Sequence, residues 1–448
     1  MKPDWRRPAT IGAVLVAVGC AIRVNNALRY PTLWGYDAKG NWEYVRRLSH
    51  SWALPEPDAG WSTSHPPLFY YLCAALSRLA NALDLDFAVV LVRFASTAAG
   101  LAIVWLAVQL VRRADPENAR RRLLAAALLL FLPGHVMISA MVNEELVAAL
   151  FTSLAVVGVA RALEGGARDS AARAAGVGAA AGLSLLTKLS GAVALATALG
   201  TYAAAGWRGG RGRAAGVRIG LVVLVASLAG GWFYARTWVR HGYVYPHALP
   251  VHEVMFSMPP GERRPYDYVN LPLATFRDPQ VLNPALLRSV WGSTHATLWF
   301  DGHRFFLPAK SDEVRRLGTL ILVLALLPSV AFGVGLLRGL RRAVLSPRGP
   351  DLPLLLLVAF TLAGYVLFTW RNPWFATLKG TYLLGLCVPF AFYASEVLAD
   401  WTRGRGVRAA ALWLALGLLA ASVTLGFSYG LVFDKREAPG LVWQATGR

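Results

Sequence analysis

The sequence contains little charge, and few of its charged residues are acidic. Only 16% of the 448 residues are Asp, Glu, Lys or Arg, whereas 56% are hydrophobic. A soluble domain carries about 25% charged residues, so this chain cannot cover a water-exposed surface with ions. Its 45 Lys and Arg exceed its 25 Asp and Glu, which gives a formal net charge of +20. Because the basic residues stand in short clusters between apolar runs, they indicate the loops of a polytopic membrane protein.

Cysteine is scarce, and the common nucleotide-binding motifs are absent. The three cysteines, Cys20, Cys73 and Cys387, lie far apart in apolar surroundings. No CxxC pair and no Cys/His zinc spacing occurs, so neither a disulfide framework nor a structural zinc site is predicted. The sequence also has no Walker motif and no dinucleotide fingerprint. Nucleotide chemistry and nucleic-acid binding are therefore not expected.

The apolar residues form segments that match a membrane span, which takes roughly 20 residues. The candidate spans are 9–28, 89–111, 122–140, 146–163, 174–187, 189–207, 216–235, 317–337, 351–369, 381–399 and 408–427. Lys and Arg clusters mark cytoplasmic loops. Six such clusters separate the spans, at Lys2/Arg6/Arg7, Arg112 to Arg122, Arg161/Arg168/Arg173, Arg208/Arg211/Arg213/Arg218, Arg338/Arg341/Arg342/Arg348 and Arg403/Arg405/Arg408. Placing them all inside the cell puts the N-terminus in the cytoplasm and the C-terminus outside.

This pattern predicts an all-α polytopic membrane protein with about eleven transmembrane helices, a single domain over 1–448, in a plasma membrane such as a bacterial inner membrane. Two outer segments are long: 29–88, with juxtamembrane helices, and 236–316, a cap of about 80 residues. Segment 65–82 begins at two prolines and carries one stripe of leucines, which favours a helix lying in the interface. Reading it as a further span is the alternative, and it would place the Arg112–Arg122 cluster outside.

The first outer loop holds two acids, Asp37 and Glu43, in the sequence LWGYDAKGNWEYV. Each has a purely structural interpretation. Asp37 fits the N-cap of a helix over 38–48, and Glu43 fits an ion pair with Arg46 or Arg47 one turn away. Taken alone, these interpretations are sufficient.

The second outer turn carries two adjacent acids, Glu144 and Glu145, at the mouth of a span. The helix dipole accounts for one acid there, but two are harder to explain, because acids near lipid are costly and mark functional sites. Four cations also fall at outer ends of spans: Lys188, Arg236, Arg371 and Lys379. They fit either snorkelling to lipid headgroups or the binding of a lipid-linked phosphate. Together, these acids and cations indicate group transfer from a lipid phosphate.

The second long outer segment opens with three histidines and an acid: His241, His247, His252 and Glu253. Histidine and carboxylate are ligands for zinc. The proline-broken spacing favours ordinary loop histidines instead.

At these positions the sequence resembles the GT-C superfamily of polyprenyl-phosphate-sugar-dependent glycosyltransferases. It is most similar to the family 39-like branch of protein mannosyltransferases and aminoarabinose transferases. The matching pieces, in chain order, are GYDAKGNWEYV, SHPPLFYYL at 64–72, NEEL, GLSLLTKLSG at 182–191, GWFYARTWVRHGYVYP at 231–246 and FATLKGTYLLGL at 375–386. No single piece is specific, but their order over residues 30–386 is typical of the superfamily.

The resemblance implies a role for each candidate residue. Asp37 is the implied catalytic base, and Glu144 or Glu145 is the implied second acid near the acceptor or a divalent metal. The implied contacts of the donor phosphate are Lys188, Arg236 and Lys379, with Arg371 as the fourth cation. Glu43 and His65 are candidate acceptor or donor contacts, and Glu144 with His65 is a weak candidate metal site.

At two positions the sequence differs from the motifs of these enzymes, so the resemblance does not identify the transferred sugar. Ala38 follows Asp37, where protein mannosyltransferases tend to show Asp-Glu, and Ser64-His65-Pro66 stands where aminoarabinose transferases show Glu-Lys-Pro. The implied partners are a polyprenyl-phosphate-linked sugar, the membrane lipid, and an acceptor that is a protein, a lipid or a glycan. A transporter or lipid flippase is the alternative, but such proteins place ionisable groups near mid-membrane and show repeated halves. A non-catalytic lipid-binding scaffold would need the cations alone.

Overall fold

The computed structural model describes residues 6–84, 87–165, 171–210, 212–308, 311–345, 349–404 and 406–434. Over these ranges the regular structure is helical, and the single β-bridge pairs Pro260 with Trp374. The predicted all-α fold is therefore confirmed. Five basic residues of the predicted clusters lie outside the described residues: Lys2, Arg168, Arg211, Arg348 and Arg405.

Nine helical segments within the described ranges are long and apolar enough to cross a membrane. They are built from α1 (Arg6–Arg29), α4 (Ala88–Ala114), α7 (Glu145–Gly165), α9 (Ala192–Arg208), α10 (Gly212–Ala226) with α11 (Trp232–His241), α16 (Asp312–Leu324) with α17 (Leu326–Leu345), α18 (Asp351–Arg371), α19 (Cys387–Trp401) and α20 (Val407–Phe427). The pair α5 (Ala119–Leu130) and α6 (Pro133–Ser139) forms a tenth segment bent by 54°, and α8 (Ala171–Thr187) is a shorter apolar helix. All eleven predicted spans are thus helical, and the polytopic membrane fold is confirmed.

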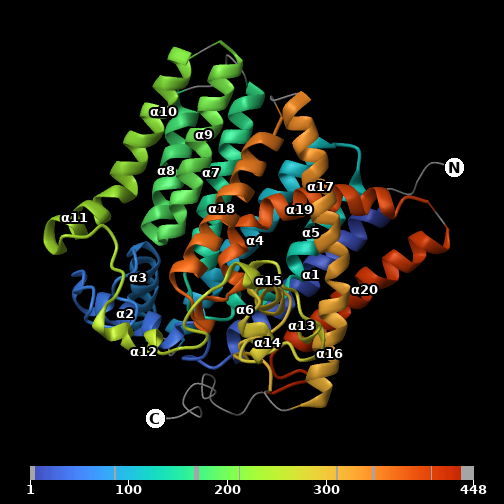
Figure 1. Ribbon diagram of the computed structural model, residues 1–448, viewed down its shortest axis with the longest axis horizontal. Helices are drawn as coiled ribbons and strands as arrows, with labels where there is room; N and C mark the ends of the chain where they lie inside the picture. Colours follow the sequence, from blue (N-terminus) through green and yellow to red (C-terminus); the bar gives the residue numbers. More distant parts are fainter. Residues whose placement is uncertain are drawn as a thin grey trace.

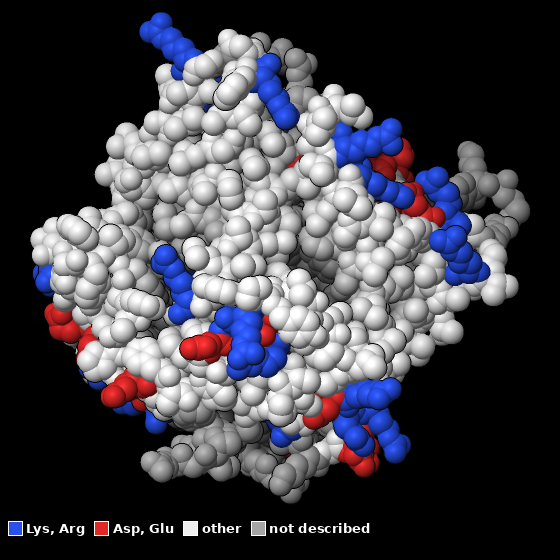
Figure 2. Space-filling view, in the orientation of Figure 1, with Lys and Arg blue, Asp and Glu red and all other residues white. Residues whose placement is uncertain are grey.

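The remaining helices gather at one end of the bundle, the lower end in Figure 1. They are α2 (Ala38–Ser51), α3 (Leu68–Ala82), α12 (Glu253–Phe256), α13 (Ala274–Arg277), α14 (Pro284–Leu287) and α15 (Val290–Leu298). On the face in Figure 2, charged side chains gather toward the upper edge and the lower third, and the surface between is mostly uncharged. Exposed apolar residues such as Trp105, Val223 and Leu337 are suited to contact with lipid there. The loops predicted to be extracytoplasmic therefore meet at one end of the bundle.

Helix α3 is the segment whose placement decided the predicted topology. It has 15 residues, so it is about 22 Å long, which is too short for a hydrocarbon core of about 30 Å. It packs against α2 and α4, and Leu72 and Leu79 remain exposed on its outer side. These features agree with a helix in the interface.

A buried arginine supports the bend between α5 and α6. Pro133 starts α6 and breaks the helical hydrogen bonding before it. Arg23 of α1 donates to the carbonyl oxygens of Leu130 (3.0 Å) and Leu129 (3.4 Å), and it contacts His135 Nδ1 at 2.7 Å. Because no water reaches backbone groups inside a bilayer, such a side chain is needed where a helix breaks. The arginine is thus accounted for by the fold.

Small residues bring α8 and α10 into backbone contact. A Cβ atom added at Gly182 would lie 2.7 Å from the carbonyl oxygen of Ala226, and one added at Gly230 would lie 2.1 Å from that of Gly182. By contrast, a Cβ at Gly176, also on α8, would meet nothing within 4 Å. The glycines of α8 and of the segment after α10 therefore let the two backbones touch, as small residues do between membrane helices.

We expect Gly182→Ala to lower the thermal unfolding temperature, because the added methyl must push α10 away at a cost of about 1–3 kcal/mol. Gly176→Ala is the matched control in the same helix. It should leave stability unchanged or raise it by up to about 1 kcal/mol through helix propensity. The measurement is the midpoint of thermal unfolding of both variants in detergent. Equal midpoints would contradict the packing described.

Candidate active site

Asp37 occupies the N-cap position of α2, but its carboxylate does not cap the helix. Its backbone is left-handed, with φ 56° and ψ 11°, and the side chain accepts no hydrogen bond from the first turn. Instead Oδ2 accepts from Lys379 Nζ and Oδ1 accepts from Trp61 Nε1, both at 2.9 Å. The capping interpretation is therefore wrong, since the carboxylate is held away from the helix by two distant segments.

Lys379 is held beside two aromatic rings. Its Nζ lies 5.1 Å from the centre of the Tyr36 ring and 5.7 Å from that of Tyr382, and the residue is 8% exposed. Burial on its own raises the pKa of Asp37, but the Lys379 ammonium and the hydrogen bonds from Lys379 and Trp61 outweigh it. The pKa of this carboxyl is thus held well below its usual range, and Asp37 is ionised.

Glu144 and Glu145 share a second lysine. Lys188 Nζ donates to Glu144 Oε1 at 2.9 Å and to Glu145 Oε1 at 2.6 Å. Burial raises the pKa of Glu144, whereas Lys188 and His65 lower it and prevail. Lys188 Nζ also lies 5.0 Å from the ring centre of Tyr382, the ring that faces Lys379. The two ion pairs therefore meet at one tyrosine and form a single polar centre.

A hydrogen-bonded chain connects α2 to the acid pair. Asn41 Nδ2 donates to the carbonyl oxygen of Val142 (2.9 Å) and to Glu144 Oε2 (3.4 Å). Its Oδ1 accepts from Tyr70 (2.9 Å), whose oxygen lies 2.9 Å from His65 Nδ1. Because the Tyr70 proton is used on Asn41, His65 Nδ1 carries the donated proton, and burial lowers the pKa of His65. The ring is therefore neutral, and its Nδ1 lies 3.9 Å from Glu144 Oε1.

His303 supports the rings that enclose Lys379. Its Nδ1 lies 3.1 Å from the hydroxyl of Tyr36 and its Nε2 lies 3.2 Å from the carbonyl oxygen of Phe375. A neutral ring satisfies both contacts, with Nε2 donating and Nδ1 accepting. Burial and the nearby Lys379 lower the pKa of His303 to about 3.

Two candidates from the sequence lie apart from this centre. Glu43 is exposed on α2, and no ion pair joins it to Arg46 or Arg47, so the structural interpretation of Glu43 is wrong. Arg371 is exposed at the end of α18 and forms no ion pair with any described acid. The structure brings together Asp37, Lys379, Glu144, Glu145, Lys188 and His65.

The described residues offer no ligand set for the divalent metal considered from the sequence. Nowhere within them are three or more His, Cys, Asp or Glu side chains arranged so that they could hold a metal ion. His65 Nδ1 lies 3.9 Å from Glu144 Oε1, but that oxygen already accepts from Lys188. His252 contacts the carbonyl oxygen of Trp61 at 2.7 Å, as an ordinary loop histidine does.

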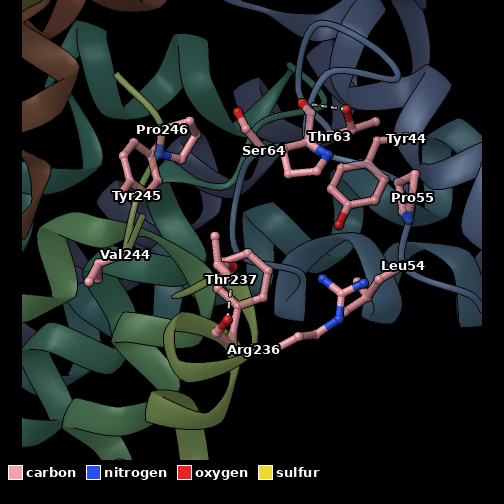
Figure 3. A pocket seen from close by; sticks show the side chains of 12 residues that line it. Tyr44, Leu54, Pro55, Thr63, Ser64, Arg236, Thr237, Val244, Tyr245 and Pro246 are labelled. Atoms are coloured by element: carbon pink, nitrogen blue, oxygen red, sulfur yellow. Dashed lines mark hydrogen bonds between the residues drawn. The ribbon is translucent and has the colours of Figure 1, made fainter. Parts of the chain in front are cut away.

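Arg236 lies in a small polar pocket between α11 and the loop before α3. The pocket is also lined by Tyr44, Ser64 and Tyr245, together with apolar residues such as Leu54 and Phe233. Figure 3 shows Arg236 and Tyr44 reaching into it from different helices. The hydroxyl of Tyr44 is buried without a hydrogen-bond partner, and Arg236 forms no ion pair with any described acid. A guanidinium and an unpaired buried hydroxyl are suited to an anion.

Several of these residues were missed by the sequence reasoning. The candidates from the sequence were charged residues at the outer ends of spans. Four residues of the centre are uncharged at neutral pH and so were not among them: Trp61, Asn41, Tyr382 and His303. Tyr382 had one signal: it stands three residues after Lys379 in the motif FATLKGTYLLGL. No spacing in the sequence indicated His303.

Comparisons with known proteins show which family and which solved structures this chain is similar to. A family model described as dolichyl-phosphate-mannose-protein mannosyltransferase matches residues 64–232. No curated protein sequence matches the chain. Among solved structures, ArnT from Cupriavidus metallidurans bound to undecaprenyl phosphate is similar, with a TM-score of 0.54 and 16% identity over 93% of this chain and 75% of that one.

The oligosaccharyltransferase of Archaeoglobus fulgidus is also similar in structure. Its complex with Zn and sulfate gives a TM-score of 0.55 and 17% identity, over 95% of this chain and 54% of that one. Its apo form gives 0.51 and 14%, over 94% and 56%. The chain thus spans little more than half of that relative's length. These likenesses show a shared fold, and the family model over residues 64–232 agrees with the resemblance found in the sequence.

We expect His303→Asn to reduce the loss of stability on acidification. The folded-state pKa of about 3 lies below the ordinary value of about 6.5, so the unfolded chain binds the proton more readily. Stability from the neutral ring is present above about pH 6.5 and declines as the pH falls toward 3, by about 1–2 kcal/mol at pH 5.

The measurement is the unfolding midpoint at pH 7.5 and pH 5 for the wild type and His303→Asn. His247→Asn, at an exposed position, is the control and should not change the difference between the two pH values. An equal fall in wild type and His303→Asn would contradict the role of His303.

Proposed function

We propose that the chain transfers a sugar from a polyprenyl phosphate to an acceptor at the extracytoplasmic face, supported by the match of residues 64–232 to a mannosyltransferase family model and by a fold similar to that of ArnT. The observation that carries the proposal is the ion pair of Asp37 and Lys379 at one end of the bundle, 2.9 Å apart, in which Lys379 is buried and Asp37 is half-buried. The pair supplies a base and a phosphate-binding cation at one point. A similar structure, ArnT, is bound to undecaprenyl phosphate.

The donor phosphate is assigned to the space between Lys379 and the Arg236 pocket. Arg236 offers the fork of donors that suits phosphate oxygens, and Lys379 offers a point charge. Tyr44 adds a buried hydroxyl that has no other partner. A phosphate bound there would satisfy this group, which is otherwise costly to leave unpaired.

The transfer is a substitution at the anomeric carbon of the sugar. The acceptor oxygen forms a bond to that carbon, and the bond from the carbon to the phosphate oxygen breaks. The electron pair of the broken bond leaves with the polyprenyl phosphate, and the acceptor proton passes to Asp37. Because the leaving phosphate is an anion, cations stabilise it and no second acid is needed, unlike the paired carboxylates of glycoside hydrolases.

Lys379 also couples donor binding to the base. Without donor, its ammonium neutralises Asp37 and keeps the carboxylate weakly basic. An arriving phosphate competes for the same ammonium. Once Lys379 turns toward the phosphate, the half-buried Asp37 loses its main stabilising charge and its basicity rises.

Glu144, Glu145 and His65 are assigned to the acceptor side of the centre. Lys188 donates to both glutamates, so its charge is already compensated there. In this proposal Lys188 orients the acids and reaches the phosphate less directly than Arg236 does. Glu43 and Arg371, both exposed, are assigned no role in transfer.

The transporter alternative has less support. It places ionisable groups near the middle of the membrane, where Arg23 and His135 do lie within the bundle. Arg23, however, also donates to backbone carbonyl oxygens where α5 breaks, which gives it a structural role. The unexplained charges lie instead at the end of the bundle.

Asp37→Asn should lower transfer by about 100-fold or more, the scale of a lost general base. Asn keeps the shape and accepts a left-handed backbone, so the protein should fold. Binding of undecaprenyl phosphate should be retained or strengthened, because Lys379 is freed. Transfer is measured with a radiolabelled polyprenyl-phosphate sugar, and Glu262→Gln at an exposed outer position is the control. Full activity of Asp37→Asn would refute the assignment.

Arg236→Gln should weaken the binding of undecaprenyl phosphate about tenfold or more, the loss of one charged hydrogen bond. Tyr44→Phe should have a smaller effect in the same direction. Arg240→Gln, exposed on the same helix, is the matched control and should bind as the wild type does. Binding is measured by fluorescence titration in detergent. Equal affinities of the two arginine variants would exclude the pocket as the phosphate site.

A further inference from the structure

A second cavity, here called the apolar groove, lies apart from the Arg236 pocket. Its empty volume is about 780 Å³, more than twice that of the Arg236 pocket. Its lining is mainly large apolar side chains, among them Trp291, Leu298, Phe332, Leu383 and Phe390. It shares no residue with the Arg236 pocket.

The groove reaches the depth of the hydrocarbon core. Ser329 and Phe332 line it from the middle of the 34-residue segment Asp312–Leu345, and Cys387 and Phe390 line it from the facing segment Phe375–Trp401. At the middle of a span the surrounding medium is lipid tails without water. A sugar or a peptide backbone entering there would lose its hydrogen bonds, whereas a hydrocarbon chain would not.

The few polar side chains of the groove are already bonded within the protein. Ser329 Oγ donates to the carbonyl oxygen of Ala325 (2.8 Å), and His295 Nε2 lies 3.1 Å from that of Leu322. The hydroxyl of Thr294 lies 2.8 Å from that of Tyr365. These three side chains are thus engaged within the protein, and the indole N–H groups of Trp291 and Trp299 are the donors that remain in a lining that is otherwise mostly apolar, which favours an apolar occupant.

The groove leads to the polar centre through the 3₁₀ helix η7 (Gly380–Leu386). Leu383, Leu384 and Leu386 line the groove, while Tyr382 of the same turn faces both lysines. Leu383 follows Lys379 by four residues, a rise of roughly 8 Å in this geometry. The head of a lipid whose chain lies in the groove can therefore extend toward Asp37 and Lys379.

The two cavities are lined by different elements. The Arg236 pocket is lined from α2 and α11, at the left of Figure 1, whereas the apolar groove is lined from α15, α17, η7 and α19. With the donor phosphate on the Arg236 side, the donor leaves the groove vacant for a second lipid chain.

We propose that the apolar groove binds a hydrocarbon chain of the acceptor, so that the acceptor is a membrane lipid rather than a protein or a soluble glycan. This inference rests on the proposed function. The sugar is then joined to a hydroxyl of the lipid head group. The bond from the anomeric carbon to the phosphate breaks, polyprenyl phosphate leaves with the electron pair, and the hydroxyl proton passes to Asp37.

The groove is tested by filling it. Ser329→Phe projects a ring into the groove and removes only a bond to its own helix. The matched control, Val330→Phe, adds a ring at the next position, which is 55% exposed on the outer surface of α17. Both variants are first checked for an unchanged unfolding midpoint, and Ser329→Leu, which fills the groove with a smaller side chain, is the substitute if Ser329→Phe does not fold, with Val330→Leu as its matched control.

The first readout is photo-crosslinking in lipid nanodiscs. The probe is a phosphatidylethanolamine that carries a diazirine in a palmitoyl chain. We expect labelled peptides from α17 and α19, with labelling about tenfold lower in Ser329→Phe and unchanged in Val330→Phe. Excess undecaprenyl phosphate should not compete. If undecaprenyl phosphate competes, the groove holds the tail of the donor. If all variants are labelled equally, the probe has labelled only lipid at the outer surface of the protein. Either result overturns the proposal.

The second readout separates this inference from the proposed function. Membranes are supplied with a radiolabelled polyprenyl-phosphate sugar, and label is counted in the lipid and the protein fractions. In the wild type we expect the label to appear in a new lipid. Asp37→Asn should abolish this labelling. Ser329→Phe should reduce it about tenfold, while its hydrolysis of the donor by water stays unchanged. Label in protein would overturn the lipid acceptor and leave the transferase standing. Undiminished label with Asp37→Asn would overturn the assignment of Asp37 as the base, and no label in either fraction would overturn the transferase itself.

Discussion

The ion pair between Asp37 and Lys379 is the constraint on which the site depends. It joins residues 342 positions apart, so the start of α2 and the start of η7 must meet for it to form. A buried ion pair contributes little net stability, because desolvation of both charges offsets their attraction. Its presence at this end of the bundle is therefore better explained by a role in the proposed transfer reaction than by a contribution to stability. Tyr382 and His303 serve it by enclosing the ammonium and excluding water.

The sequence was sufficient for the membrane fold because the physical signal is strong there. Apolar runs and basic clusters follow directly from the cost of burying charge and backbone in lipid. Two of the predicted spans are irregular helices: the span over 122–140 is bent between α5 and α6, and the span over 174–187 is the short helix α8. The charged members of the candidate site were also predictable, since they stand at the outer ends of apolar spans, where a charge near lipid is costly without a function.

Other parts of the site could not be predicted from spacing. Whether Asp37 caps α2 or turns away depends on one backbone angle and on Trp61 and Lys379, which no local pattern reveals. Glu43 and Arg371 had the right charge, but their helices turn them to solvent. The Arg236 pocket and the apolar groove arise only from packing of segments distant in sequence. The contrast between one polar cavity and one apolar cavity is what distinguishes the two proposed substrates.

The left-handed backbone at Asp37 restricts what this position can become. Asn, Asp and Gly accept φ near 56° at little cost, whereas a β-branched residue there would be strained. Variation at position 37 therefore falls into two separate classes. Some residues remove the carboxylate and leave the loop intact, and others distort the loop that carries Tyr36 and Asn41 as well. A complete set of substitutions at this one position would consequently separate the contribution of the charge from that of the backbone, which few buried catalytic residues allow.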